Sequence, residues 1–295
     1  MVEAREVFGL DRARLRAAFE RASANYESAA GLQARVAAEL IERVAAFNFQ
    51  PQVVLDLGAG TGRVTRELKR RYPRALVIAL DLAAGMLREA RRHQRLWRRF
   101  ARVCGDALRL PLKDGSVDLV FSSLMLQWCE PLDVAFAEAR RVLSPQGFLA
   151  FSTFGPDTLN ELRSAWTQAD GYNHVNGFVD MHDVGDSLVR SGLAEPVLDV
   201  ERLILNYPNA LALMRDLKTI GARNATAGRP RSLAGRARLT RVTDAYEAFR
   251  REGQLPATYE VIYGAAWSAS GRNAARMSGG ETLIAPGSIR RRSSP

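Results

Sequence analysis

Three glycines and three aspartates in the first half of the chain are spaced so that they could bind a small charged ligand. Gly58, Gly60 and Gly62 directly follow an apolar run that ends in Asp56 and Leu57. Glycines in such a turn let backbone N–H groups approach a ligand, and the N-terminus of a following helix favours a negatively charged group. The segment therefore predicts a ligand-binding loop.

The spacing of these glycines excludes the usual dinucleotide fingerprint, which is G-x-G-x-x-G. Its last position falls on Arg63 when counted from Gly58, and on Thr65 when counted from Gly60. The pattern present is D-x-G-x-G-x-G, which sets the carboxylate of Asp56 beside the loop. This suits a ligand with a cationic amino-acid end and no pyrophosphate, a description that S-adenosylmethionine meets and NAD does not.

Two further aspartates follow the next two apolar runs. Asp81 could accept hydrogen bonds from both ribose hydroxyls, and Asp106 could accept one from the adenine amino group. A single acid after a strand is commonly a helix cap or a solvated loop residue. Three acids at successive strand ends instead predict S-adenosylmethionine as the cofactor. We expect neighbouring residues to contact it as well: Ala59, Leu82, Met86, Ala107 and Ser122.

Short apolar runs alternate with helical segments around these residues. We predict strands at 52–57, 75–80, 101–104, 117–121 and 148–153, and helices at 11–47, 61–72, 84–100 and 131–143. This order is typical of an α/β fold, a Rossmann-like parallel sheet with helices on both faces. Two later strands, 197–206 and 258–267, are separated by about 50 mostly helical residues, which we expect to cap the carboxyl edge of the sheet.

The predicted organisation is an N-terminal helical cap over 1–48, a main domain over 49–267 with a helical insertion at about 207–255, and a flexible basic tail over 268–295. Hydrophobic residues make up 47% and charged residues 25%, which is ordinary for a globular protein. Two cysteines and three histidines show no metal-ligand spacing, so no metal is expected. Without a long apolar run or a signal segment, we expect a cytoplasmic protein that does not bind membranes.

The net charge of +10 comes mainly from two groups of arginines. The first runs from Arg88 to Arg102 along one face of the predicted helix at 84–100, opposite a core-facing stripe that includes Trp97. The second lies in the insertion and comprises Arg223, Arg229, Arg231, Arg236, Arg238 and Arg241. Such groups often form solvated faces, but unbalanced ones also attract an acidic protein or a nucleic acid.

The segment after the fourth strand argues against a nucleic-acid substrate. Enzymes that methylate base nitrogens usually carry an N-P-P-Y-like turn there, where the flipped base is held. This chain has Phe121-Ser122-Ser123-Leu124 instead. Cys129 lacks the preceding proline that is usual for a nucleophilic cysteine, and we interpret it as a structural thiol. We therefore expect no nucleic acid as the substrate.

Over roughly residues 35–155 the chain resembles the class I methyltransferase superfamily. That resemblance implies a seven-stranded sheet with an antiparallel last hairpin and S-adenosylmethionine as the cofactor. It also implies an N-terminal helix over the cofactor, in which Tyr26 would close the site, although Tyr26 equally fits an ordinary core aromatic.

A narrower resemblance covers nearly the whole chain. Residues 151–159, 181–186, 214–224 and 256–263 are similar to the malonyl-acyl-carrier-protein O-methyltransferase family of biotin synthesis. The family departs from this chain at Gly177, where its members often have arginine. The resemblance implies methylation of the free carboxylate of a malonyl thioester carried by acyl-carrier protein or coenzyme A. It also explains the basic groups, because acyl-carrier protein is acidic.

This chemistry needs positioning more than acid or base catalysis. A carboxylate is already ionised at neutral pH and needs no general base, so no catalytic triad is expected. Burying its charge does require a cation, and we expect Arg215 first, then Lys218 and Arg229. Trp128 fits either a lid over the methyl group or core packing. His174 and His182 are interpreted as loop caps rather than substrate contacts, and the oligomeric state is not predicted.

Other functions remain as alternatives. The chain shares Ser122-Ser123-Leu124, Tyr207-Pro208 and residues 256–259 with complex I assembly factors that hydroxylate an arginine of a partner protein. That function would favour a mitochondrial address and a weakened cofactor loop, and neither is seen here. A methyltransferase for another small acid or for nucleic acid is a second alternative. A non-catalytic binding module is a third, and the three intact aspartates argue against it.

Overall fold

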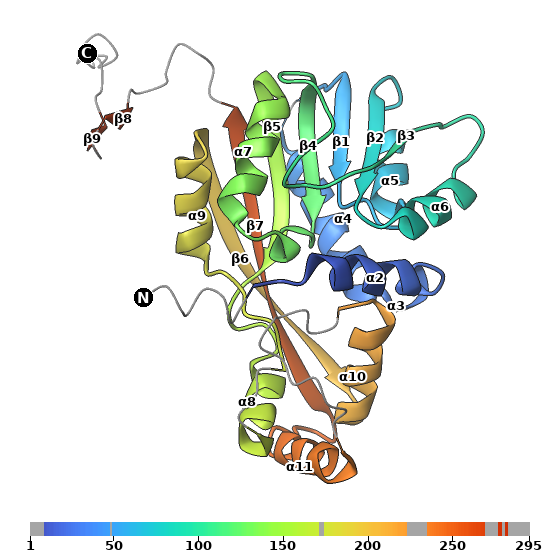
Figure 1. The fold of residues 1–295 in the computed structure, drawn as a ribbon, viewed down its shortest axis with the longest axis vertical. Helices are drawn as coiled ribbons and strands as arrows, with labels where there is room; N and C mark the ends of the chain where they lie inside the picture. Colours follow the sequence, from blue (N-terminus) through green and yellow to red (C-terminus); the bar gives the residue numbers. More distant parts are fainter. Residues whose placement is uncertain are drawn as a thin grey trace, which may run out of the picture.

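The computed structural model of the protein describes residues 9–47, 49–170, 174–222, 235–268, 277–278 and 281–282. A seven-stranded sheet in the order β3-β2-β1-β4-β5-β7-β6 forms its centre (Figure 1). Its strands are β1 Val53–Leu57, β2 Leu76–Asp81, β3 Ala101–Cys104, β4 Val117–Ser123, β5 Leu143–Phe154, β6 Leu193–Tyr207 and β7 Leu255–Ser268. A two-stranded pair, β8 Met277–Ser278 and β9 Glu281–Thr282, lies outside this sheet.

The first five strands run parallel, and β7 runs antiparallel between β5 and β6. In β1, Val54 pairs with Val77 of β2 and Leu55 pairs with Val120 of β4, and all four side chains are fully or nearly fully buried. Burial on both faces explains why these strands are almost continuously apolar in sequence. The predicted Rossmann-like fold, with its antiparallel last hairpin, is confirmed.

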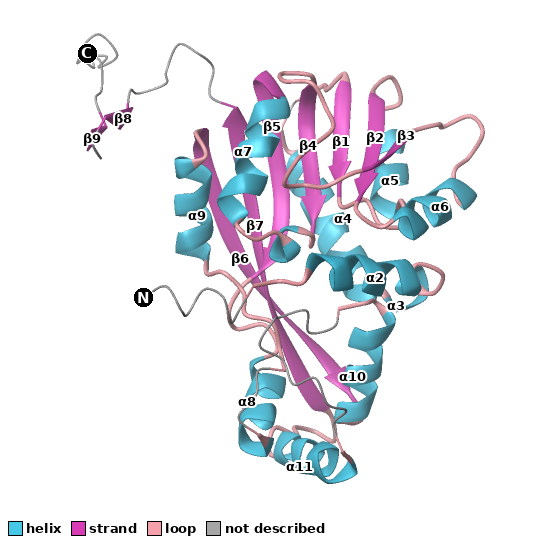
Figure 2. Ribbon diagram, in the orientation of Figure 1, coloured by secondary structure: helices cyan, strands magenta, loops and turns pink. Residues whose placement is uncertain are grey.

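Helices cover both faces of the sheet (Figure 2). They are α2 Arg12–Ala22, α3 Tyr26–Ala29, α4 Gly31–Ala45, α5 Arg63–Arg71, α6 Ala84–Arg92, α7 Leu132–Val142, α8 Asn160–Ala169, α9 Met181–Arg190, α10 Ala210–Thr219 and α11 Arg236–Glu247. Side chains of α4, α5 and α6 share one core cluster with Val54. Those of α7 and α9 share another with Leu55 on the opposite face.

The hairpin of β6 and β7 extends beyond the sheet and carries a second lobe made by α8, α10 and α11 (Figure 2). Its small core includes Leu213, Val242 and Tyr246, each fully buried. The Tyr246 hydroxyl donates a hydrogen bond to the Pro256 carbonyl at 2.8 Å, which joins α11 to β7. The predicted helical insertion is therefore present between the last two strands as α10 and α11. Helices α8 and α9 had not been predicted.

Two predicted helices differ from the structure. Residues 11–47 form three helices, α2, α3 and α4, with breaks near Ser23 and Ala30. The helix predicted over 84–100 ends at Arg92, where like-charged arginines three and four residues apart would repel one another. A loop follows instead, in which the Gln94 side chain donates to the Phe100 carbonyl at 3.0 Å.

The end of α6 at Arg92 corrects the predicted arginine stripe. Because the helix stops at Arg92, the later arginines of this group do not continue its face. Trp97, which was predicted to face the core, is 95% exposed. Two arginines of the group are paired with acids, since Arg88 binds Glu20 of α2 and Arg92 binds Glu89. Part of the positive charge is therefore balanced within the protein.

Candidate cofactor and substrate site

A cavity of about 490 Å³ lies at the carboxyl ends of the parallel strands, under the N-terminal helices, and continues into the second lobe. Its cofactor-side wall comes from the glycine loop and from the ends of β2 and β3. Its other wall comes from α8, α10 and the β6–β7 extension. The cavity therefore joins the predicted cofactor loop to the insertion.

The glycine loop adopts a conformation that requires glycine. Gly58, Gly60 and Gly62 have φ of +82°, +54° and +76°, in the left-handed region. A Cβ on Gly58 would lie 2.3 Å from Cγ of Met125, which is too close for any side chain. The N–H groups of Gly58 and Ala59 both donate to the Leu80 carbonyl, at 2.8 and 3.0 Å. The loop is thus held against the end of β2.

Asp81 ends β2 and lines the cavity. Its Oδ2 accepts a hydrogen bond from the Gly60 N–H at 2.9 Å, and its Oδ1 accepts one from the Ala83 N–H at 2.8 Å. Burial raises the pKa of Asp81, and these two backbone hydrogen bonds partly offset the rise. Each carboxylate oxygen has a second lone pair, so the group can still accept from a diol such as ribose. Leu82 and Met86 line the cavity beside it.

Asp106, together with Ala107, lines the cavity just beyond β3. Its Oδ1 accepts a hydrogen bond from the Leu108 N–H at 2.9 Å, and its Oδ2 forms an ion pair with Arg12 of α2. Burial would raise the pKa of Asp106, but the bonds from Arg12 and Leu108 outweigh it and lower the pKa below its ordinary value. Arg12 was missed in the sequence, because α2 and β3 are far apart along the chain.

Four residues predicted to contact the cofactor lie behind the cavity wall. Asp56 is 2% exposed and accepts a hydrogen bond from the Thr65 hydroxyl at 2.5 Å. Burial raises the pKa of Asp56 to about 7. The Ser122 hydroxyl donates to the Leu57 carbonyl at 2.9 Å. Asp56 and Ser122 thus support the strands under the loop and do not line the cavity. Ala59 and Gly62 do not line it either. Direct contact with the cofactor stays a prediction for Asp56, Ala59, Gly62 and Ser122.

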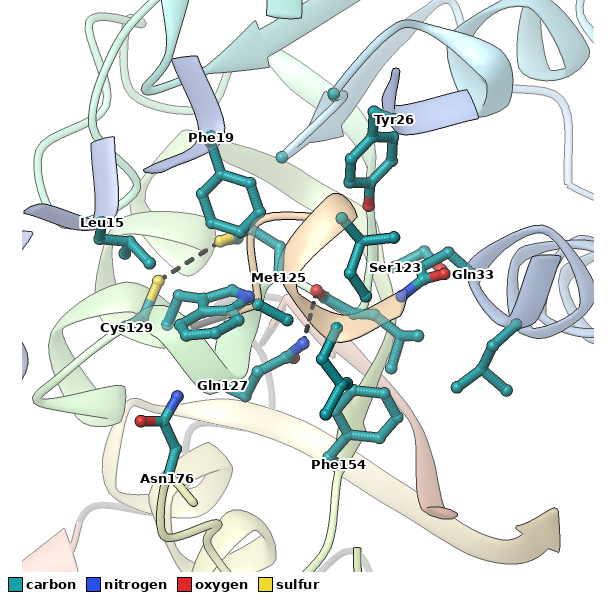
Figure 3. Close-up of a pocket in the computed structure, with 18 of the residues that line it drawn as sticks. Leu15, Phe19, Tyr26, Gln33, Ser123, Met125, Gln127, Cys129, Phe154 and Asn176 are labelled. Atoms are coloured by element: carbon teal, nitrogen blue, oxygen red, sulfur yellow. Dashed lines mark hydrogen bonds between the residues drawn. The ribbon is translucent and has the colours of Figure 1, made fainter. Parts of the chain in front are cut away.

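Tyr26 reaches into the cavity from α3, as Figure 3 shows. A Cβ on Gly60 would lie 4.0 Å from its ring. Burial raises the pKa of Tyr26 to about 12, so its hydroxyl is neutral at physiological pH. The same helix is fastened to the glycine loop, because Glu27 accepts hydrogen bonds from Thr61 at 2.9 Å and from Arg66 at 2.8 Å. Tyr26 thus lines the cavity, and its role in closing the cofactor site stays a prediction.

The segment after β4 also lines the cavity. The Gln127 amide donates to the Leu124 carbonyl at 2.6 Å (Figure 3), and its oxygen accepts from Thr153 at 3.4 Å. Trp128 lines the cavity and packs edge-on against Phe19 of α2, with 5.5 Å between the ring centroids. Trp128 therefore lines the cavity and also holds α2 in place through its contact with Phe19.

Cys129 behaves as a structural thiol. Burial raises its pKa to about 12, so it is protonated at neutral pH and cannot act as a thiolate nucleophile. Its sulfur lies 3.4 Å from the sulfur of Met125. This agrees with the interpretation made from the residues around it.

The wall on the second lobe is largely aromatic. Phe154 packs against Phe178 and Tyr259, with ring centroids 5.7 Å apart in each pair. The Tyr207 hydroxyl donates to Oδ2 of Asp216 at 2.9 Å. His174 also lines this wall, whereas His182 is exposed and does not. Among the described residues, this wall offers a mainly apolar surface with a few fixed polar groups.

Two cations predicted to hold the substrate lie outside the cavity. Arg215 and Lys218 are exposed on α10 and do not line it, whereas Asp216 and Leu217 do. Leu213, Leu217 and Ile220 share one helical face, a pattern visible in the sequence that turns Arg215 and Lys218 outward. Arg229, together with Arg223 and Arg231, lies outside the described residues.

The residues on the cofactor side fit S-adenosylmethionine. The loop brings backbone groups to the cavity, Asp81 can accept from a diol, and Asp106 lines the cavity together with apolar residues. Across the described ranges, no group of three or more His, Cys, Asp or Glu side chains could hold a metal ion. None of the helices in those ranges is long and apolar enough to cross a membrane.

Comparison with known proteins agrees with this geometry. Residues 55–151 match the family model of a methyltransferase domain. The chain is 50% identical over 287 residues to the malonyl-acyl-carrier protein O-methyltransferase of Laribacter hongkongensis, covering 95% of this chain and 97% of that protein. It is 51% identical to the protein of the same name from Methylovorus sp., covering 90% and 92% of the two chains.

Solved structures show the same fold at low identity. The YcgJ protein of Bacillus subtilis matches with a TM-score of 0.56 and 14% identity, covering 77% of this chain and 97% of that one. A SAM-dependent methyltransferase of Thermotoga maritima matches with a TM-score of 0.51 and 16% identity, covering 86% and 99%. These similarities concern the fold alone.

Proposed function

Because the chain belongs to the malonyl-acyl-carrier protein O-methyltransferase family, we propose that it methylates the free carboxylate of malonyl-acyl-carrier protein. Its family and fold make it an S-adenosylmethionine-dependent methyltransferase. The proposal concerns the acceptor and the way the site holds it. It places the reaction early in biotin synthesis and the protein in the cytoplasm.

The observation that carries the proposal is the continuity of one cavity from the glycine loop to the aromatic chamber of the second lobe. A malonyl thioester on its flexible carrier arm is thin, with methylene and thioester groups between the amides of the arm and the terminal carboxylate. The aromatic wall of Phe154, Phe178 and Tyr259 suits such an arm. The same cavity ends at the cofactor loop, where the carboxylate would meet the methyl donor.

The residues present suit catalysis by positioning. When bound, S-adenosylmethionine supplies a methyl group on a good leaving group. An acceptor carboxylate is already ionised at neutral pH, so the protein needs no residue to remove a proton. Gln127, fixed at both ends of its amide, and Trp128, packed on Phe19, form a firm wall beside the acceptor. Residues of α2 and α3 line the cavity, and shielding of the acceptor from water by these helices would strengthen electrostatic contacts inside.

The experiment uses purified protein, S-adenosylmethionine labelled in its methyl group, and three acceptors. Malonyl-acyl-carrier protein should be labelled, and acetyl-acyl-carrier protein, which lacks the carboxylate, should not. Malonyl-coenzyme A reports how much the carrier protein itself contributes. Equal labelling of the malonyl and acetyl forms would contradict the proposal, because the methyl group would then be going to another atom.

A further inference from the structure

The carboxylate of a malonyl acceptor needs hydrogen-bond donors inside the cavity. Arg215 and Lys218 lie outside the cavity lining. Arg12 is part of the lining but is ion-paired with Asp106. At the second lobe, the carboxylate of Asp216 lines the cavity and would repel another carboxylate. Neutral side chains of the described wall can supply the donors instead.

Gln33 brings such a donor from the first turn of α4. It lines the cavity, and Figure 3 shows its side chain pointing inward. Ala37 and Leu40, four and seven residues further along the helix, are buried, so Gln33 lies on the buried face of α4. No hydrogen bond joins its side-chain amide to another of the described residues. Because a polar group on a buried face costs free energy unless it has a partner, this amide is available for a ligand.

Trp128 brings a second donor from the turn after β4. It lines the cavity, and its ring is held edge-on against Phe19. Within the described ranges, no acceptor binds its indole N–H. The turn lies against the cofactor loop, because Met125 fills the space beside Gly58. An indole N–H donates and cannot accept, so it suits an anion close to the cofactor.

Neutral donors suit this acceptor better than a cation would. A hydrogen bond to an ionised carboxylate is roughly twice as strong as one between neutral groups. The first turn of α4, which lines the cavity from Gly31 to Gln33, adds the partial positive charge of a helix N-terminus. A protein cation beside the sulfonium of S-adenosylmethionine would be repelled by it. Two neutral donors pair with the carboxylate and avoid that repulsion.

Resting on the proposed function, we propose that the amide of Gln33 and the indole N–H of Trp128 together bind the free carboxylate of the malonyl group. One donor comes from α4 and the other from the turn after β4, so the carboxylate is bound from two elements of the cavity wall. The methyl ester that the reaction forms is neutral and gains less from the same donors. The contact therefore selects the malonyl acceptor and weakens once the ester has formed, which favours product release.

The first test compares the wild-type protein with Gln33→Leu, which keeps the size of the side chain and removes the donor. The KM for malonyl-acyl-carrier protein should rise about tenfold or more, with kcat changed much less. The dissociation constant for S-adenosylmethionine, measured by calorimetry, should stay the same. Gln33→Glu keeps the shape and adds a negative charge, so it should raise this KM further. Gln168→Leu is the matched control, because Gln168 is exposed on α8 and lies outside the cavity lining.

The second test uses Trp128→Phe, which keeps an aromatic ring against Phe19 and removes the N–H. It should give a similar rise in the KM for malonyl-acyl-carrier protein, again with the affinity for S-adenosylmethionine unchanged. Trp97→Phe is its control, since Trp97 is exposed and outside the cavity lining. For both residues, inhibition by the methyl ester product should change much less than the KM of the charged acceptor.

An unchanged KM in a folded variant of either residue, with a Tm equal to that of the wild type, would overturn the inference. A weakened affinity for S-adenosylmethionine would also overturn it, because the donor would then belong to the cofactor. So would an equal loss of affinity for the neutral ester and the malonyl acceptor. These failures differ from that of the proposed function, in which the wild-type protein itself would not methylate malonyl-acyl-carrier protein.

Discussion

The carboxylate of Asp81 accepts a hydrogen bond from the backbone N–H of Gly60, with 2.9 Å between Oδ2 and the nitrogen. This bond ties the end of β2 to the glycine loop that follows β1, so two separate strand ends form one rigid wall. The wall exists before any ligand arrives. A preformed site of this kind loses less entropy on binding, which increases affinity.

Asp81→Asn should weaken cofactor binding. The amide has one oxygen where the carboxylate has two, so it cannot accept from both Gly60 and Ala83 and also serve the ribose. Loss of one or two charge-assisted hydrogen bonds should lower affinity for S-adenosylmethionine about 10- to 100-fold, measured by calorimetry. Asp186→Asn, on the exposed side of α9, is the control. Equal affinities of the wild-type and Asp81→Asn proteins would remove Asp81 from the cofactor site.

Gly58→Ala should destabilise the protein as well as block the cofactor. The new Cβ would lie 2.3 Å from Cγ of Met125 in a residue whose φ is +82°. Left-handed strain and overpacking together should cost roughly 3 kcal/mol of unfolding free energy, seen as a lower Tm. Gly177→Ala is the matched control, because nothing lies within 4 Å of its Cβ position. Similar Tm values for the two variants would show that the loop can relax.

Asp56 should make stability depend on pH. Burial raises its pKa to about 7 in the folded protein, above the ordinary value near 4 in the unfolded chain. The folded state therefore binds an extra proton between these pH values, and its free energy of unfolding falls as pH rises through this range. Because asparagine does not titrate, Asp56→Asn removes this pH dependence of the unfolding free energy. Relative to wild type, the variant should gain stability between pH 4.5 and pH 8, on the order of a few kcal/mol in denaturant titrations. A difference that does not change with pH would contradict the prediction.

The two cysteines should differ in reactivity. Cys104 is exposed at the end of β3, whereas burial raises the pKa of Cys129 to about 12. Because the thiolate is the reactive form, iodoacetamide at pH 8 should modify Cys104 in the folded protein and leave Cys129 intact. Mass spectrometry of the resulting peptides measures this directly. Cys104→Ser should then take up no label until the chain is unfolded. Rapid labelling of Cys129 in the folded variant would show that α2 opens readily.

Much of the fold and of the cofactor side was predictable from the sequence, because the signals are local. These signals are glycines in a turn, an aspartate after a strand and a short apolar run. Each can be recognised from residues that are adjacent in the chain. The parallel sheet, the loop at Gly58 and the acids Asp81 and Asp106 were placed in this way. Their positions along the cavity follow from the rule that parallel strands end at the same edge.

The substrate side was decided by tertiary packing. Arg215 and Lys218 suggested a carboxylate site by charge alone, yet α10 turns Leu213 and Leu217 inward and leaves both cations exposed. Helix α6 likewise ends at Arg92, and Trp97 lies in solvent despite its apolar spacing.

The contacts that complete the site join residues far apart in the chain. Arg12 meets Asp106, and His174 is stacked on Trp166 and held through Asp170 by Arg238 of α11. Sequence by itself determined the type of fold and the cofactor, since those follow from residue types at short spacing. That Arg215 and Lys218 point away from the cavity followed only from the tertiary packing, because a side chain's direction depends on what its helix packs against.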